Sequence, residues 1–173
     1  MVTVAAQLVT TYLEMTDPDQ LNGSSAPRPD ARVERMTTPD VGFYRYLYKA
    51  VGEKYRWRDR LSMSNKALYN TLNSPQTHVH VLYVDGAPAG YIELQEQGTA
   101  VEIAYFGLRE AYHGRGLGKY LLSYGVQKAW ELGARRVWLH TCNLDGEYAL
   151  ANYQKRGFRV YQREIEPMPE IYQ

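Results

Sequence analysis

The stretch Ala104 to Tyr120, AYFGLREAYHGRGLGKY, decides the fold of this chain. It opens with apolar and aromatic residues, which predict a buried strand that breaks at Gly107-Leu108. The glycine-rich run from His113 to Gly118 follows, and a helical amphipathic pattern begins directly behind it. Glycines let the backbone curl close to a ligand, and the unpaired N–H groups of a first helical turn can then hold a phosphate. The stretch therefore predicts a strand, a loop and a helix amino-terminus that together bind an anion.

The spacing of the loop separates it from two familiar nucleotide-binding loops. Tyr120 stands where a P-loop needs Ser or Thr, and Lys119 stands where the dinucleotide fingerprint needs its third glycine. The remaining pattern, Q/R-x-x-G-x-G/A before a helix, resembles the pyrophosphate loop of the GNAT acyltransferases, with His113 in place of the usual Gln or Arg. Alone, the same residues also fit a turn that merely joins a strand to a helix.

A second motif strengthens the resemblance. The pattern Ala149-x-x-x-Tyr153-x-Lys155-x-Gly157-Phe158 is similar to the carboxy-terminal signature of the same family and follows at the expected distance. From about residue 32 to the end, the chain therefore resembles a GNAT N-acetyltransferase. The Asn that the family commonly has seven residues before the Tyr would fall at Gly146, and Asn143 is the candidate replacement.

Periodicity and turn residues predict the other elements. We expect strands over residues 7–15, 32–36, 78–84, 87–95, 100–107, 135–141 and 158–165, and helices over 41–51, 64–72, 117–132 and 146–155. Thr38, Ser64 and Asp145 are the expected N-caps. The fold class is α/β, with a GNAT-type mixed, largely antiparallel central sheet of six to seven strands flanked by helices. We expect residues 1–31 to form an amino-terminal strand and an exposed connection, and residues 32–173 to form a single GNAT domain.

Composition narrows the class of protein. A net charge of +1 gives no bulk attraction to nucleic acid or to an anionic membrane, and no apolar run approaches a membrane span of ~20 residues. Arg28 is the first basic residue, which argues against a signal peptide. Cys142 is the single cysteine, so a reducing cytoplasm is the expected location. Four scattered His residues and one Cys show no metal-ligand spacing.

The resemblance implies transfer of an acetyl group from the co-substrate acetyl-CoA to a primary amine, by direct attack in a ternary complex. In this family the central strand separates from its parallel neighbour, which leaves main-chain N–H groups free. A bulge at Gly107 would be compatible with that separation. The residues expected to bind the co-substrate are Phe106, Leu108, His113, Gly114, Arg115, Gly116, Leu117, Gly118, Lys119 and Asn143.

Two residues are expected to move protons. Tyr153 matches the general acid of the family, and packing of its ring is the alternative role. Glu102 lies eleven residues before His113, the offset of the glutamate base in the histone-acetylating branch, and its apolar neighbours should raise its pKa. Glu102 could instead be a structural carboxylate, for example one paired with Arg60. His140 is the alternative base, and water is the third possibility.

Residues 43–61, which include most of the first expected helix, are rich in aromatic rings, and the whole chain has 16 Tyr. In the family this region lines the acceptor pocket, so the expected substrate-binding residues are Tyr44, Tyr48, Trp57, Arg60 and His140. The alternative is that these rings belong to the core. The expected partner is a small-molecule amine, and the chain could be a monomer or a homodimer. Two other functions stay open: a catalytically silent acyl-CoA-binding or sensing domain, and an acetyltransferase that modifies proteins.

Overall fold

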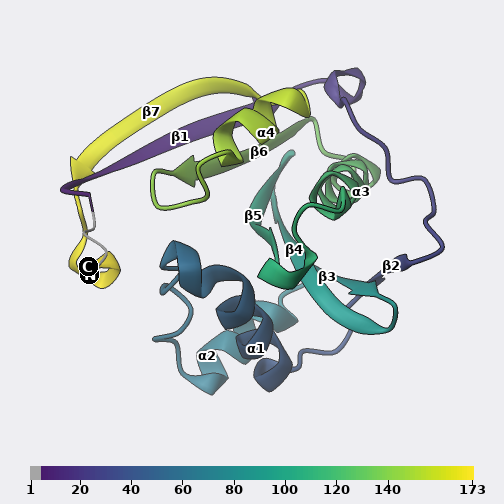
Figure 1. The fold of residues 1–173 in the computed structure, drawn as a ribbon, viewed down its shortest axis with the longest axis horizontal. Helices are drawn as coiled ribbons and strands as arrows, with labels where there is room; N and C mark the ends of the chain where they lie inside the picture. Colours follow the sequence, from purple (N-terminus) through teal and green to yellow (C-terminus); the bar gives the residue numbers. More distant parts are fainter. Residues whose placement is uncertain (1–4) are drawn as a thin grey trace.

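Seven strands form one open sheet in the computed structural model, which describes residues 5–173 (Figure 1). The strands are β1 (Gln7–Met15), β2 (Ala31–Arg35), β3 (Thr77–Val84), β4 (Ala87–Gln97), β5 (Ala100–Leu108), β6 (Arg136–Cys142) and β7 (Arg159–Pro167). Their order is β2-β3-β4-β5-β6-β1-β7, and every neighbouring pair is antiparallel except β5–β6. The mixed, largely antiparallel sheet predicted from the sequence is confirmed.

Four α-helices cover the two faces of this sheet. They are α1 (Val41–Gly52), α2 (Asn65–Asn73), α3 (Leu117–Glu131) and α4 (Ala149–Lys155). One core lies between α3 and the sheet, with Leu121 against Ile92 and Leu94 as examples, and α4 packs on its margin through Leu150. A second core lies on the opposite face, between α1, α2 and strands β3 and β4. Among residues 5–173, no helix is long and apolar enough to cross a membrane.

Helix starts show where local sequence rules hold and where they fail. Ser64 caps α2 as predicted, with its hydroxyl accepting from the Ala67 N–H at 3.1 Å. The prediction of Thr38 as a cap is wrong, because the Asp40 carboxylate accepts from the Phe43 N–H at 2.9 Å instead. The prediction of Asp145 as a cap is also wrong, since α4 begins at Ala149. The Asp145 carboxylate instead closes the turn after β6, where it accepts from the Thr141 hydroxyl at 2.6 Å and the Cys142 N–H at 3.0 Å.

Strands β5 and β6 pair over only three residues before they part. Ala100–Glu102 lie opposite Arg136–Trp138, and no further pairs join the two strands. Strand β5 continues to Leu108 with β4 as its remaining partner, so its other edge has no strand beside it. The bulge of β5 is at Ala104 and not at Gly107, which pairs in register with Tyr91. Gly107 is needed for close packing, because a Cβ there would lie 2.5 Å from the Val51 Cγ1 atom on α1.

The amino-terminal strand lies inside the sheet. Strand β1 pairs with both β6 and β7, so it separates the last strand from the rest. The connection after it passes α4 and α3 before it reaches β2 at the far edge (Figure 1). Along this path the Asn22 N–H donates to the Arg156 carbonyl at 2.8 Å, and the Ser25 hydroxyl bonds to Gln127. A domain boundary at residues 31–32 stays a prediction. Strand β1, which precedes it, is hydrogen-bonded to β6 and β7, which follow it.

We predict that Gly157→Ala destabilises the fold more than Gly133→Ala does. Both glycines have positive φ angles, +107° and +89°, so alanine is strained by about 1–2 kcal/mol at either position. A Cβ at Gly157 would also lie 1.8 Å from the Gln20 carbonyl oxygen, whereas nothing lies within 4 Å at Gly133. Overpacking of this kind adds about 1–3 kcal/mol. Urea denaturation of both variants measures the difference, and equal losses of unfolding free energy would contradict the close approach.

Candidate active site

The glycine loop joins the end of β5 to the start of α3. Gly114 and Gly116 have φ angles of +78° and +73°, which are backbone conformations that favour glycine. Gly116 is the N-cap of α3, and no side chain there bonds to the N–H groups of the first turn. Those N–H groups are therefore available to an anion, with the positive end of the helix dipole behind them. His113 has its Nε2 atom 3.2 Å from the Leu108 carbonyl oxygen, so its ring ties the loop back to β5.

An arginine of the amino-terminal connection lies against this loop. Arg28 forms a two-pronged ion pair with Asp30, at 3.0 and 3.1 Å, and Arg115 of the loop lies 3.5 Å from the same carboxylate. The Arg28 guanidinium also donates to the Arg115 carbonyl at 3.4 Å. The hydrogen bonds from Arg28 hold the pKa of Asp30 below the usual range, so the carboxylate stays charged. The two arginines outweigh the one carboxylate and add positive charge beside the loop. No spacing rule connects Arg28 with the loop, so the sequence did not predict this contact.

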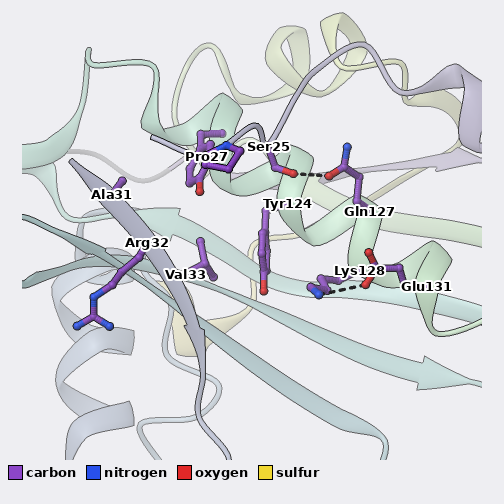
Figure 2. Close-up of a pocket in the computed structure, with 10 residues that line it drawn as sticks. Ser25, Pro27, Ala31, Arg32, Val33, Tyr124, Gln127, Lys128 and Glu131 are labelled. Atoms are coloured by element: carbon purple, nitrogen blue, oxygen red, sulfur yellow. Dashed lines mark hydrogen bonds and ion pairs between the residues drawn. The ribbon is translucent and has the colours of Figure 1, made fainter. Parts of the chain in front are cut away.

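A cavity of about 360 Å³ lies between the same connection and α3 (Figure 2). Its walls come from residues 25–33 on one side and from one stripe of α3 on the other, including Tyr120, Tyr124 and Gln127. Figure 2 shows Ser25 reaching Gln127 across one end and Lys128 turned toward Glu131. Neither Glu102 nor Tyr153 lines it. This cavity is therefore separate from the residues predicted to carry the chemistry.

Tyr153 packs beside the unpaired edge of β5. Its ring lies edge-on to Phe106 and to Phe158, with centroids 6.3 and 6.1 Å apart. Burial, and secondarily the charge of Asp145, raises the pKa of Tyr153 well above that of free tyrosine. The phenol is protonated at neutral pH, as an ordinary tyrosine is, and has a proton to donate. Asn143, by contrast, bonds to β1: its side chain accepts from the Val9 N–H and donates to the Gln7 carbonyl, both at 2.9 Å.

Glu102 and His140, the two candidate bases, lie side by side. One Glu102 oxygen is 3.8 Å from His140 Nε2, and the other accepts from the Gln97 amide at 3.1 Å. The Glu102 side chain is 15% exposed and that of His140 is 48% exposed, so the pair has access to solvent. Burial raises the pKa of Glu102, and the neighbouring His140 charge opposes that rise. The structure thus joins two residues that the sequence treated as alternatives.

A second carboxylate, Glu93, is fully buried next to this pair. It accepts from the Tyr44 hydroxyl at 2.6 Å and from Arg60 at 2.8 Å, and the Arg60 guanidinium lies 4.8 Å from the Tyr105 ring centroid. Arg60 therefore pairs with Glu93 and not with Glu102, which corrects the alternative considered from the sequence. The sequence analysis missed Glu93. Its signal is a charged residue between the apolar residues Ile92 and Leu94.

The predicted substrate wall divides into buried and accessible parts. Tyr44 and Tyr48 are each 1% exposed, and their rings stack with centroids 6.1 Å apart in the core beneath α1. Trp57 is half-buried and packs 5.7 Å from Tyr48 and 5.3 Å from Tyr105. Arg60 has a side chain that is 14% exposed. The substrate roles of these residues stay predictions, and the geometry makes Tyr44 and Tyr48 supports for the exposed members.

We predict that Arg60→Ala makes stability fall with rising pH. Removing Arg60 leaves a buried carboxylate without its counter-ion, at a cost of about 3–5 kcal/mol. Burial raises the pKa of Glu93 and Arg60 lowers it, so without Arg60 the folded state holds a proton that the unfolded chain releases. Relative to wild type, the unfolding free energy should fall from pH 4.5, the ordinary carboxyl value, upward through the folded pKa.

Urea denaturation between about pH 4 and pH 8 measures this slope for the variant and for wild type. The control is Glu93→Gln on the Arg60→Ala background, because it removes the titrating group and should flatten the profile. A flat profile in Arg60→Ala itself would show that Glu93 does not titrate in this range.

Comparisons with known proteins agree with this geometry. A family model described as the acetyltransferase (GNAT) family matches residues 43–158, more than half of the chain. Mycothiol acetyltransferase from Corynebacterium efficiens is 32% identical in an alignment of 126 residues that covers 68% of this chain and 41% of that protein. The chain thus spans less than half the length of that relative.

Solved structures share the fold. A GCN5-related N-acetyltransferase from Kribbella flavida has a TM-score of 0.62 and 17% identity, over 88% of this chain and 54% of that one. An aminoglycoside acetyltransferase from an uncultured soil metagenomic sample, in complex with sisomicin, has a TM-score of 0.61 and 19% identity, over 73% and 86%. These identities show similarity of fold alone. Because the family model matches more than half of its residues, the chain belongs to the acetyltransferase (GNAT) family.

Proposed function

We propose that this chain transfers an acetyl group from acetyl-CoA to the primary amine of a small molecule, by direct attack of the amine in a ternary complex. The observation that carries the proposal is the parting of β5 and β6 after three residue pairs. An anion-binding loop lies at the end of β5, and the Glu102–His140 pair lies where the two strands separate. The family uses acetyl-CoA. In this proposal the loop binds the phosphates of acetyl-CoA, the free edge of β5 binds its thioester arm, and the amine lies at the Glu102–His140 pair.

Main-chain groups of the loop would hold the co-substrate. The N–H groups of the first turn of α3 suit its pyrophosphate, and Arg28 and Arg115 add positive charge beside them. The unpaired edge of β5 near Phe106 and Leu108 can hydrogen-bond to the thioester arm, because buried main-chain groups need partners. When bound, acetyl-CoA supplies the activated acetyl group.

Three side chains would handle the protons. A lysine-like amine has a pKa near ~10.4 and must lose a proton before it attacks. Glu102, with its raised pKa, accepts that proton, and His140 beside it stabilises the carboxylate. Tyr153, whose phenol is protonated at neutral pH, donates a proton to the departing thiolate. In this proposal the Glu102 carboxylate is the base and the Tyr153 phenol is the acid that the reaction needs.

Two further features support a small-molecule acceptor in a reducing compartment. The names of the relatives refer to mycothiol and aminoglycosides, which suggests small acceptors for this chain as well. Cys142 is the single cysteine and a free thiol, which suits the cytoplasm. The acceptor itself is sought by measuring thiol release from acetyl-CoA with amines, amino acids, aminoglycosides and peptides.

We predict that Gly118→Ala weakens CoA binding without weakening the fold. Gly118 lies in the first turn of α3, and a Cβ there would meet no protein atom closer than 3.8 Å. A loss of affinity would therefore report the close approach of the ligand, with overpacking of about 1–3 kcal/mol corresponding to roughly a 5- to 150-fold higher Kd. Calorimetry with CoA measures it. Gly42→Ala in the first turn of α1 is the matched control, since its nearest atom is also 3.8 Å away. An unchanged Kd for Gly118→Ala would contradict the proposal that the glycine loop binds CoA.

We predict that Glu102 sets the acidic limb of kcat/KM for the amine. The limb rises as Glu102 loses its proton, at a pH above that of an ordinary glutamate because burial raises its pKa. Glu102→Gln should remove this limb and lower activity about 10²- to 10⁴-fold. His140→Asn should move the limb to higher pH, since the His140 charge lowers the pKa of Glu102. Tyr153→Phe should lower kcat with little change in KM for acetyl-CoA.

The reverse pattern, with the limb lost in His140→Asn and kept in Glu102→Gln, would make His140 the base. If neither variant moves the limb, the amine loses its proton to water. CoA binding without thiol release for any amine in the panel would favour a silent sensing domain over an enzyme.

A further inference from the structure

Gln97, the last residue of β4, joins three strands at the point where β5 and β6 separate. Its amide nitrogen donates to Glu102 Oε1 on β5 at 3.1 Å, and its amide oxygen accepts from Trp138 Nε1 on β6, also at 3.1 Å. Gln97 pairs with Ala100 on β5, and because Ala100 carries only a methyl group, the Gln97 side chain can reach across β5 to β6. Glu102 and Trp138 are the last residues to pair before the two strands separate.

The indole of Trp138 fixes the direction of this amide. An indole N–H can donate a hydrogen bond but cannot accept one, so the oxygen of the Gln97 amide must face Trp138. The NH2 group then faces Glu102, whose ionised carboxylate can only accept. If the amide turned over, two acceptors would meet at Glu102 and two donors would meet at Trp138, and both hydrogen bonds would be lost. Trp138 therefore acts on Glu102 through Gln97.

The Gln97 amide occupies one oxygen of Glu102 and leaves the other for the reaction. Oε1 accepts from Gln97, while Oε2 lies 3.8 Å from His140 Nε2, which is too long for a hydrogen bond. An oxygen without a bonded donor keeps its lone pairs for an incoming proton. The proton acceptor of the proposed reaction is thus narrowed to one atom, Glu102 Oε2.

Charged groups from three other parts of the fold also face Glu102. Burial raises the pKa of Glu102, and His140 on β6, the Gln97 hydrogen bond and Arg60 between α1 and α2 lower it. The charge of Glu102 in turn raises the pKa of Glu93 on β4. Arg60 already pairs with Glu93 at 2.7 Å, and His140 lies beyond hydrogen-bond distance. Gln97 is therefore the partner that bonds directly to the Glu102 carboxylate.

We propose that Gln97 is a positioning residue of the active site, which holds Glu102 Oε1 so that Oε2 takes the proton from the amine. Trp138 in turn holds the Gln97 amide. A carboxylate without this partner could present either oxygen to the amine. It would also be protonated more easily, since a hydrogen bond to the charged form favours that form. The inference rests on the proposed function, because it concerns the base of that reaction.

Gln97→Ala should move the acidic limb of kcat/KM for the amine to higher pH, because the charged form of Glu102 loses a hydrogen bond. At a pH below the limb, kcat/KM should fall about tenfold, the ratio expected for one hydrogen bond to a charged group. Gln97 is exposed, so its replacement should leave the fold intact, which urea denaturation checks.

The matched control is Gln95→Ala. Gln95 lies on the same strand as Gln97 and pairs with Glu102 in register, but its amide oxygen accepts from the Thr77 hydroxyl at 2.8 Å. This control should leave the acidic limb where it is. A limb that stays in place in Gln97→Ala, or that moves equally in both variants, would overturn the inference.

Carbon-13 NMR of the side-chain carboxyl groups measures the titration of Glu102 without any substrate, and so separates this inference from the proposed function. The Glu102 signal is the one that Glu102→Gln removes, and in Gln97→Ala it should titrate at higher pH than in wild type. That shift without turnover of any amine would support the hold of Gln97 on Glu102 and overturn the acetyltransferase proposal. An unchanged titration would overturn the inference, whatever the activity.

Trp138→Phe tests the remaining link, because it keeps a ring and removes the donor. The Glu102 signal should move in the same direction as in Gln97→Ala. The double variant should titrate with Gln97→Ala alone, since the indole acts only through the amide. Additive shifts in the double variant would show that Trp138 acts on Glu102 by a separate path, and would overturn the proposed role of Trp138 in holding the amide.

Discussion

The limited pairing of β5 with β6 is the constraint on which the rest of the site depends. Two parallel strands need a crossover, and here the crossover is α3, whose first turn begins at the glycine loop after β5. The same connection that makes the pair parallel therefore sets free N–H groups at the end of β5. Because pairing stops at Glu102, the main-chain groups along the rest of that edge have no strand partner, and they form the edge proposed to bind the co-substrate. If β5 and β6 separated further along β5, the free edge proposed for the thioester arm would be shorter. If they separated earlier, Glu102 and His140 would lie apart.

Two carboxylates on one face of the sheet have different environments and are suited to different roles. Glu93 is fully buried, and its Oε1 atom accepts hydrogen bonds from Tyr44 and Arg60, so it holds these two side chains in place. Glu102 has only the Gln97 amide and a distant imidazole, so it keeps the capacity to take a proton. The Glu102 charge raises the pKa of Glu93, which makes the counter-ion Arg60 more important. The buried Glu93–Arg60 pair is thus structural, and Glu102 is the carboxylate that stays accessible.

The sequence predicted those parts of the fold that follow from local rules. The glycine loop and the Ser64 cap each depend on a few adjacent residues. So does the hairpin between the strands expected over residues 78–84 and 87–95, where Asp85 and Gly86 have φ angles of +50° and +86°. It failed where a side chain finds its partner through the tertiary fold. Glu93 meets Arg60 across 33 positions, and Arg28 meets the loop across 87, distances over which no periodicity carries information. Asp145 was misassigned because the groups that precede it on β6 compete for its carboxylate.

Strands β1 and β7 lie outside the part of the chain that matches the family. The glycine loop, Glu102, His140 and Tyr153 all lie within residues 43–158, the part that matches the family. Tyr12, Tyr161 and Glu164 lie outside it, on β1 and β7, and they come together only because β1 lies between β6 and β7. Asn143 holds β1 in this place through two main-chain hydrogen bonds. Changes in β1 and β7 can therefore alter the face of the sheet that carries Tyr12 and Tyr161, while the residues proposed to move protons keep their positions.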